Sequence, residues 1–186
     1  IYEAYKTGKE QPVMTIDKNG NKFWKLNDKL HREDGPAIEW ANGSKSWYLN
    51  GERHREDGPA IEYANGDKLW YLNDRLHRED GPAIEHMDGS KEWYLNGYRH
   101  REDGPACEWY HGNDHIVHKE WWLNNKRHRE DGPAIEFADG EKEWYLNGKE
   151  LTEQEYNRTQ NIKKLKDTFN NLEARINPKI ADALSE

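Results

Sequence analysis

The sequence predicts an all-β repeat array, in which antiparallel β-hairpins form one elongated single-layer sheet, followed by a C-terminal α-helical tail. Three observations lead to this fold class. The heptapeptide HREDGPA occurs at residues 31–37, 54–60, 77–83, 100–106 and 128–134, so successive copies begin 23, 23, 23 and 28 residues apart. Asn-Gly or similar turn pairs separate short aromatic and β-branched runs in each repeat, as is typical of hairpins. Residues 151–186 then change to a helical period.

The composition fits a folded chain that is built around aromatic side chains. Only 33% of the residues are hydrophobic and 34% are charged, a balance typical of disorder, but nine Trp and ten Tyr can bury large areas. The net charge of −8 argues against binding to duplex nucleic acid, which requires clustered basic residues. No apolar run approaches the roughly 20 residues of a membrane span. The single cysteine, Cys107, fits a reducing compartment, and no secretory signal opens the sequence, so we expect a cytoplasmic protein.

Three segments follow from these patterns. Residues 1–12 are an N-terminal extension, residues 13–150 are the hairpin repeats, and residues 151–186 are a helical tail or cap. Within the array, residues 13–28 form a degenerate first copy of the unit and residues 134–148 form the last half-unit.

The first turn of each unit sets the expected faces of the sheet. If Asn42 and Gly43 form a two-residue loop, Ile38 lies opposite Trp47, and Tyr48 projects from the other face. The tryptophans should then be mostly buried and the tyrosines that follow them more exposed. This expectation applies to Trp47, Trp70, Trp93 and Trp144 against Tyr48, Tyr71, Tyr94 and Tyr145.

The second turn, Asn50-Gly51, leads into the heptapeptide. It places Arg53 opposite Tyr48 and His54 opposite Trp47, so the His and Glu of HRED should share the Trp face, and its Arg and Asp the Tyr face. The Asp-Gly-Pro that follows is expected to be a bend that steps the chain to the next hairpin, with a third chain reversal as the alternative.

Five equivalent copies of HRED argue for a structural role, because an active site needs one asymmetric constellation of residues. In the structural hypothesis, the Arg of one unit pairs with carboxylates of its own or a neighbouring unit. In the alternative, Arg and Tyr form a multivalent binding stripe on one face. The candidate binding residues of this stripe are Tyr48, Tyr71, Tyr94, Trp122, Tyr145, Arg55, Arg78, Arg101 and Arg129.

The units YLNGERHREDGPAIEYANGDKLW and WYLNGYRHREDGPA resemble variant MORN repeats over residues 13–150, and also resemble repeat proteins of bacteriophages and large DNA viruses. The resemblance implies a single-layer elongated sheet that serves as an interaction scaffold. Where the MORN family usually has His-Gly-x-Gly, this chain has His-Arg-Glu-Asp-Gly-Pro. This departure and the negative net charge argue against carrying over the phospholipid binding proposed for some MORN proteins.

The fifth unit is five residues longer than the others and is rich in histidine. His111, His115 and His118 cluster near Cys107 and Asp114, which are residue types that bind zinc. Their spacing matches no strong metal signature, so we predict no metal site. The three histidines are instead candidate binding residues of a protruding loop, with an extended hairpin of solvated histidines as the alternative.

The tail carries clear signals for the start of a helix. Thr152 and Glu155 form a capping box, Leu151 and Tyr156 form a hydrophobic staple, and Asn177-Pro178 is expected to break or restart the helix. One apolar stripe follows, consisting of Ile162, Leu165, Phe169, Leu172 and Ile176. We expect the stripe to fold back over the open end or the apolar face of the sheet. A homodimer or a partner helix, held through residues 151–186, is the alternative.

No nucleophile elbow, Walker loop, dinucleotide fingerprint or HExxH motif occurs in the sequence, so we expect neither an enzyme nor a cofactor. The leading hypothesis is a non-catalytic repeat scaffold that binds a protein partner. The viral resemblance extends it to a phage or viral inhibitor of a host protein in the host cytoplasm. The second hypothesis is a sequestering protein that holds a small anionic, nucleotide-like ligand between the Tyr and Arg side chains.

Overall fold

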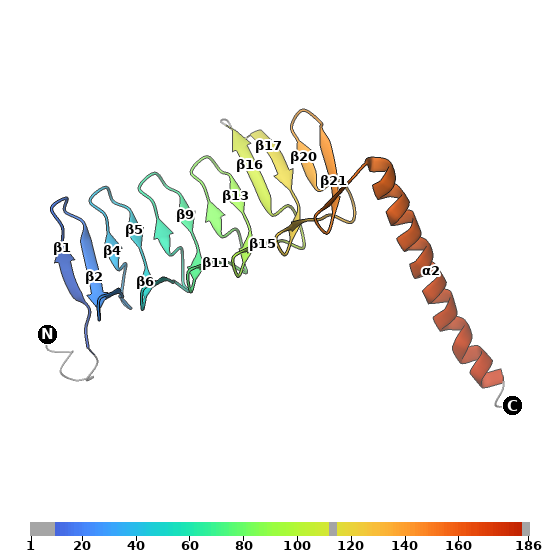
Figure 1. Cartoon of the computed structure of the whole chain (residues 1–186), viewed down its shortest axis with the longest axis horizontal. Helices are drawn as coiled ribbons and strands as arrows, with labels where there is room; N and C mark the ends of the chain where they lie inside the picture. The colour runs from blue at the N-terminus through green and yellow to red at the C-terminus, as the bar shows by residue number, and fades with distance from the viewer. Residues whose placement is uncertain (1–9, 112–114, 184–186) are drawn as a thin grey trace.

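The computed structural model describes residues 10–111 and 115–183 and has the predicted fold class. Figure 1 shows an elongated array in which the strands stand side by side along its length, with one long helix leaving its C-terminal end. Residues 1–9 of the predicted N-terminal extension lie outside the described residues. The prediction of an antiparallel hairpin array with a helical tail is therefore confirmed.

Among the described residues, one long sheet contains 14 antiparallel strands. Its path runs through β1 (Val13–Ile16), β2 (Lys22–Leu26), β4 (Ile38–Glu39), β5 (Lys45–Ser46), β8 (Ile61–Glu62), β9 (Lys68–Leu69), β12 (Ile84–Glu85), β13 (Lys91–Glu92), β16 (Cys107–His111), β17 (His115–Glu120), β20 (Ile135–Phe137), β21 (Lys142–Leu146) and β22 (Lys149–Leu151), with β3 (Lys29–Leu30) paired to β2. Four small hairpins extend the units: β6 (Tyr48–Leu49) with β7 (Glu52–Arg53), β10 (Tyr71–Leu72) with β11 (Arg75–Leu76), β14 (Tyr94–Leu95) with β15 (Tyr98–Arg99), and β18 (Trp122–Leu123) with β19 (Lys126–Arg127).

The turn at Asn42-Gly43 has three residues and not two, so the predicted register is wrong by one residue. Ile38 pairs with Ser46, and the backbone N–H of Trp40 donates to the carbonyl of Ser44 at 2.9 Å. Gly43 has a φ of +94°, the left-handed position that closes a three-residue hairpin loop. The side chain of Asn42 accepts a hydrogen bond from the Ser44 N–H at 3.0 Å and so stabilises this longer loop.

The second turn agrees with the prediction. Asn50 and Gly51 have φ values of +54° and +92°, as a two-residue type I′ turn requires, and Tyr48 pairs with Arg53. The N–H of His54 also donates to the carbonyl of Trp47, at 3.2 Å, as the pairing of these two residues implies.

The heptapeptide is a bend that steps the chain sideways, as predicted. In the first unit, β2 is one continuous strand that pairs antiparallel with both β3 and β4, so β3 and β4 run in the same direction. The segment between them, residues 31–37, therefore changes the position of the chain without reversing it.

The buried row of the array is narrow, and both large aromatic rows are only partly buried. Trp47, Trp93 and Trp144 are half-buried like the tyrosines that follow them, and Trp70 is half-buried whereas Tyr71 is only 9% exposed. The prediction that the tryptophans are the more buried row is therefore wrong. A single-layer sheet has no second layer to cover either face, so each face is covered by its own side chains. The buried row itself consists of Ala37, Ile38, Ala60, Ile61, Ala83, Ile84, Ala106, Cys107, Ala134 and Ile135.

Helix α2 (Glu153–Ala183) begins at the predicted capping box. The N–H of Thr152 donates to Glu155 Oε2 at 2.9 Å, and the N–H of Glu155 donates to Thr152 Oγ1 at 3.2 Å. The helix continues through Asn177 and Pro178, so the predicted break is wrong. A proline removes one backbone hydrogen bond, and here this loss does not end the helix. Among the described residues, no helix is long and apolar enough to cross a membrane.

The apolar stripe of α2 does not fold back onto the sheet, contrary to the prediction. Its five residues are 45–70% exposed, and Figure 1 shows the helix leading away from the array. Tyr156, in the first turns of the helix, is buried and fastens the helix to the array instead.

The turns allow a first test of the fold. We expect Asn125→Gly to stabilise the protein by about 0.5 kcal/mol, because Asn125 has a φ of +63° at a type I′ position. Gly97 occupies the equivalent position with a φ of +86°, and Gly97→Ala should destabilise by about 1 kcal/mol. Urea unfolding of both variants measures the two shifts, and shifts of the same sign would contradict the assigned turns.

Candidate functional site

Each HREDGPA arginine is held in place by its own surroundings. The guanidinium of Arg78 lies 4.2 Å from the centre of the Trp70 ring and donates from Nε to Asp80 Oδ1 at 2.9 Å. Its Nη1 donates to the Pro82 carbonyl at 3.2 Å and to Glu85 Oε1 at 3.0 Å. The same stack recurs as Arg32 on Trp24, Arg55 on Trp47, Arg101 on Trp93 and Arg129 on Trp121. The expected pairing of arginine with carboxylates is therefore confirmed.

The glycine of the heptapeptide is explained by the same contact. A Cβ atom on Gly81 would lie 2.9 Å from Cζ of Arg78, which is closer than real side chains approach. The guanidinium is therefore enclosed between the indole ring on one side and the bare backbone of Gly81 on the other. The sequence Arg-Glu-Asp-Gly-Pro is a compact structural unit around one arginine.

The histidine of the heptapeptide connects one unit to the next. Nδ1 of His77 accepts a hydrogen bond from the N–H of Asn96 at 3.1 Å, in the type I′ turn of the following unit. The N–H of Arg78 donates to the carbonyl of Tyr94, also at 3.1 Å. The other histidines accept in the same way in the pairs His31 with Asn50, His54 with Asn73, His100 with Asn124 and His128 with Asn147.

The predicted stripe of Tyr and HREDGPA arginines on one face is not present. The four candidate arginines lie over tryptophan rings; they are Arg55, Arg78, Arg101 and Arg129. Adjacent residues of a strand point to opposite faces, so these tryptophans lie on the face opposite to the tyrosines and Trp122 that follow them. Different arginines cover the row that contains the tyrosines and Trp122, namely Arg53 over Tyr71, Arg99 over Tyr94, and Arg127 over Tyr145 and Trp122. The pairing of Arg53 with Tyr48, which the second turn predicts, was the signal for these arginines.

Four hollows open between successive HREDGPA segments on the Trp face. The hollow between the second and third copies has a volume of about 640 Å³, and Trp70 and Leu72 line it together with Arg55 and Arg78. Its rim includes Glu56 and Asp57 of one copy and Glu79 of the next, with side chains 84–86% exposed. The hollows before and after it have volumes of about 550, 630 and 740 Å³. We call this series the HREDGPA hollows.

The rims of the hollows carry negative charge. Hydrogen bonds from the arginine of the same copy lower the pKa of Asp57, Asp80 and Asp103 below the ordinary value of 3.8. At the fifth copy, Nζ of Lys163 from α2 lies 2.6 Å from Glu130 Oε2, which lowers the pKa of Glu130 and raises that of Lys163. The helix of this chain therefore already places one ammonium group on this row of acids.

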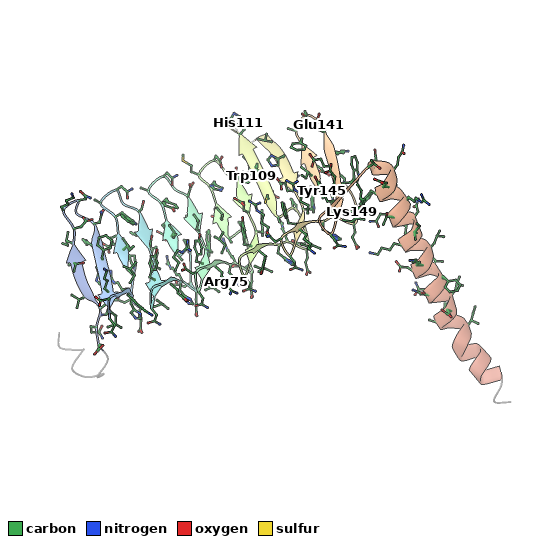
Figure 2. All side chains as sticks on the ribbon, viewed as in Figure 1. Arg75, Trp109, His111, Glu141, Tyr145 and Lys149 are labelled. Carbon is green, nitrogen blue, oxygen red and sulfur yellow. The ribbon has the colours of Figure 1, made fainter. Side chains whose placement is uncertain are left out.

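The fifth unit is an extended hairpin, and a bulge shifts its register between Trp109 and Tyr110. His111 is exposed near the tip, where Figure 2 shows it, and Trp109 stacks against His118 at 5.9 Å. Asp114 and the side chain of His115 lie outside what the structure describes. Within the described part of the chain, no group of His, Cys, Asp and Glu is placed to hold a metal ion. Whether this hairpin binds a partner stays a prediction.

Cys107 lies among buried and partly buried charged residues, which the sequence did not predict. Burial raises the pKa of its thiol to about 12, so the thiol stays protonated at neutral pH. Cys107 pairs with Glu92 on one neighbouring strand and with Glu120 on the other. Nη2 of Arg99 donates a hydrogen bond to Glu92 Oε2 at 2.9 Å. Glu92 stands at the position that Leu69 occupies one unit earlier, and this departure from the repeat was the signal for a charged interior.

Two candidate binding residues are engaged in this interior. The hydroxyl of Tyr94 donates to Glu92 Oε2 at 2.9 Å, and the indole N–H of Trp122 donates to Glu120 Oε2 at 2.8 Å. Burial is the main reason that the pKa of Tyr94 is raised to about 12. These two groups therefore donate to carboxylates of the interior and are less available to a ligand.

Comparison with protein-family models found no match, and a search of curated proteins found no similar sequence. The functional argument therefore rests on the geometry of the array.

The arginine stack can be tested by mutation. Arg78→Ala should lower the free energy of unfolding by about 2 kcal/mol, because it removes the contact with Trp70 and hydrogen bonds to two carboxylates. Arg75→Ala, at an exposed position of β11 in the same unit, should change it by less than about 0.5 kcal/mol. Urea unfolding compares the two variants, and equal losses would contradict the structural role of the stack.

The paired aspartates predict an acid dependence of stability. A carboxylate whose pKa is lowered in the folded state stabilises the fold above its unfolded pKa, and this contribution is lost as the pH falls through the folded pKa. Stability should therefore fall between about pH 5 and pH 2. The variant D57N/D80N/D103N should be less stable at neutral pH, and its stability should fall less on acidification. Urea unfolding across this range measures both effects, with Asp167→Asn on the exposed helix as the control.

Proposed function

We propose that this chain is a non-catalytic repeat scaffold that binds a protein partner through the HREDGPA hollows. One observation carries the proposal: four hollows, each with an apolar floor and an acidic rim, repeat along one face at the period of the array. A row of similar sites suits a long partner with a matching period, because several weak contacts add up when they are linked.

The chemistry of the hollows favours lysine side chains. The aliphatic stem of a lysine fits against a floor such as Trp70 and Leu72, and its ammonium group suits the exposed carboxylates of the rim. The ion pair between Lys163 and Glu130 supports this choice, because it places a lysine ammonium group on the rim of the fourth hollow within one chain.

The spacing of the units favours a helical partner. Equivalent points of neighbouring units are two strands apart in the sheet, which corresponds to roughly 9.6 Å. Seven residues of an α-helix span about 10.5 Å, so lysines seven residues apart on one helix face would meet successive hollows. The proposed partner is therefore a protein helix with lysines at this spacing.

The alternative of a small anionic ligand has weaker support. The HREDGPA arginines are each occupied by an aspartate, a glutamate and a tryptophan, and exposed carboxylates surround them. An anion would have to displace these contacts and approach like charges. If nucleotides raise the melting temperature in a thermal-shift panel, this alternative gains the support that the geometry does not give it.

The resemblance to MORN repeats and to viral repeat proteins remains part of the proposal. In that setting the partner would be a host protein and the site of action the host cytoplasm. A designed peptide can test the site whatever the source of the partner.

Binding to a designed helical peptide tests the proposal. A peptide with lysines at positions i, i+7 and i+14 should bind the wild-type chain more tightly than a peptide of the same composition with scrambled spacing. The variant E56Q/E79Q/E102Q should weaken binding of the matched peptide about tenfold, because each exposed ion pair contributes about 0.5 kcal/mol. Isothermal titration calorimetry at low salt measures the affinities.

A matched control separates the rim from the net charge. The variant E52Q/E141Q/E150Q also removes three exposed carboxylates, and none of them lines a hollow. It should leave the affinity within about twofold of wild type. If both variants weaken binding equally, or if the scrambled peptide binds as well as the matched one, the proposed site is wrong.

A further inference from the structure

Helix α2 exposes a continuous apolar stripe that no part of the described chain covers. Its five large side chains, spaced 3, 4, 3 and 4 residues apart, are Ile162, Leu165, Phe169, Leu172 and Ile176. Leu165 and Phe169 are 70% and 65% exposed. Figure 2 shows that most of the helix extends away from the array. A contiguous apolar surface of this kind marks an interaction site.

The anchoring of the helix leaves the stripe accessible. The first turns are held by buried Tyr156 and by the ion pair between Lys163 and Glu130. Lys163 follows Ile162 by one residue and so lies about 100° around the helix axis from it. The side of the helix that faces the array is therefore not the side that carries the stripe.

We propose that a second copy of this chain covers the stripe, with the two α2 helices packed antiparallel. In this arrangement Phe169 of one copy packs against Leu172 of the other, and Leu165 packs against Ile176 of the other. The twofold axis passes between Asn170 and Asn171. The spacing of the stripe is that of a heptad seam, which suits helix pairs that cross at a shallow angle.

Charged residues beside the stripe select the antiparallel orientation. Lys166 and Glu173 each follow a leucine of the stripe, Leu165 and Leu172, and flank it on the same side. In the antiparallel pair, Lys166 of each copy faces Glu173 of the other, which gives two ion pairs of opposite charge. In a parallel pair, Lys166 would face Asn161 and Glu173 would face Thr168, so neither would meet an opposite charge.

The antiparallel pair is also compatible with the two arrays. With the axis between Asn170 and Asn171, Ala183 of one copy lies opposite Arg158 of the other. Arg158 is more than one turn inside α2, which begins at Glu153. The apolar layers run from Leu165 to Ile176 and so lie beyond Tyr156 and Lys163, the residues that hold the helix to the array. Only four apolar layers form, so the dimer should be weak and dependent on concentration.

Sedimentation equilibrium of the full chain over a concentration series tests the proposal. The wild-type chain should show a monomer–dimer equilibrium, and L165N/L172N should remain monomeric at every concentration. Lys166→Glu and Glu173→Lys should each weaken the dimer about tenfold, since each places like charges opposite one another twice. The double variant K166E/E173K should restore the wild-type affinity, because the charges are exchanged and complementary again.

The control variant K164E/D167K exchanges charges on the helix surface away from the stripe and should leave the affinity unchanged. Circular dichroism of each variant verifies that the helix and the array remain folded. A wild-type chain that stays monomeric, or a dimer that survives L165N/L172N, would overturn the proposal. Failure of K166E/E173K to restore affinity would overturn the antiparallel register. The peptide-binding experiment uses the array, so its outcome is independent of this one.

Discussion

The stack of an arginine on a tryptophan is the interaction on which the rest of the array depends. A sheet with one layer has no opposing layer to bury its large side chains, so each face must be covered by groups of its own. In every unit the guanidinium covers one side of the indole ring, and its donors reach the Asp, the Pro carbonyl and, in most copies, the Glu of the following strand. The contact therefore joins the end of one hairpin to the start of the next. The glycine and the bend follow from it, because the flat guanidinium requires the bare backbone that Gly81 provides.

The heptapeptide also makes the hydrogen bonds that connect one unit to the next. The histidine beside each arginine accepts from a backbone N–H in the turn of the next unit, so the heptapeptide fixes both its own hairpin and its neighbour. Repeat arrays of this kind gain stability mainly from contacts between nearest neighbours. The fifth unit keeps these connections although its hairpin is longer, because the extra residues lie at the far end, beyond Trp109 and His118. The insertion is tolerated because it does not disturb the heptapeptide.

The sequence predicts the parts of the fold that local chemistry determines. The turn at Asn50-Gly51, the start of the helix at Thr152 and the bend at the heptapeptide each depend on residues close in sequence. The turn at Asn42-Gly43 was misassigned, because the same pair of residues also closes a three-residue loop when only the glycine is left-handed. The extra loop residue shifts the pairing across the first hairpin by one position, so Ile38 pairs with Ser46 and not with Trp47. The site was predictable only in part, because the covering of Trp70 by Arg78 depends on how the chain returns after the bend.

The charges of the heptapeptide explain why its outer surface is acidic although each copy contains an arginine. The guanidinium forms ion pairs with the aspartate of its own copy and with the glutamate of the next strand. In the third copy the side chain of Arg78 is only 22% exposed. The glutamate beside it, Glu79, lies 3.7 Å from His77 and is 84% exposed. At the outer surface of the heptapeptide the carboxylates are therefore exposed, and the arginine is mostly covered. The repeat that stabilises the fold thus also produces an evenly spaced row of negative charge, and the proposed binding face needs no separate set of residues to form it.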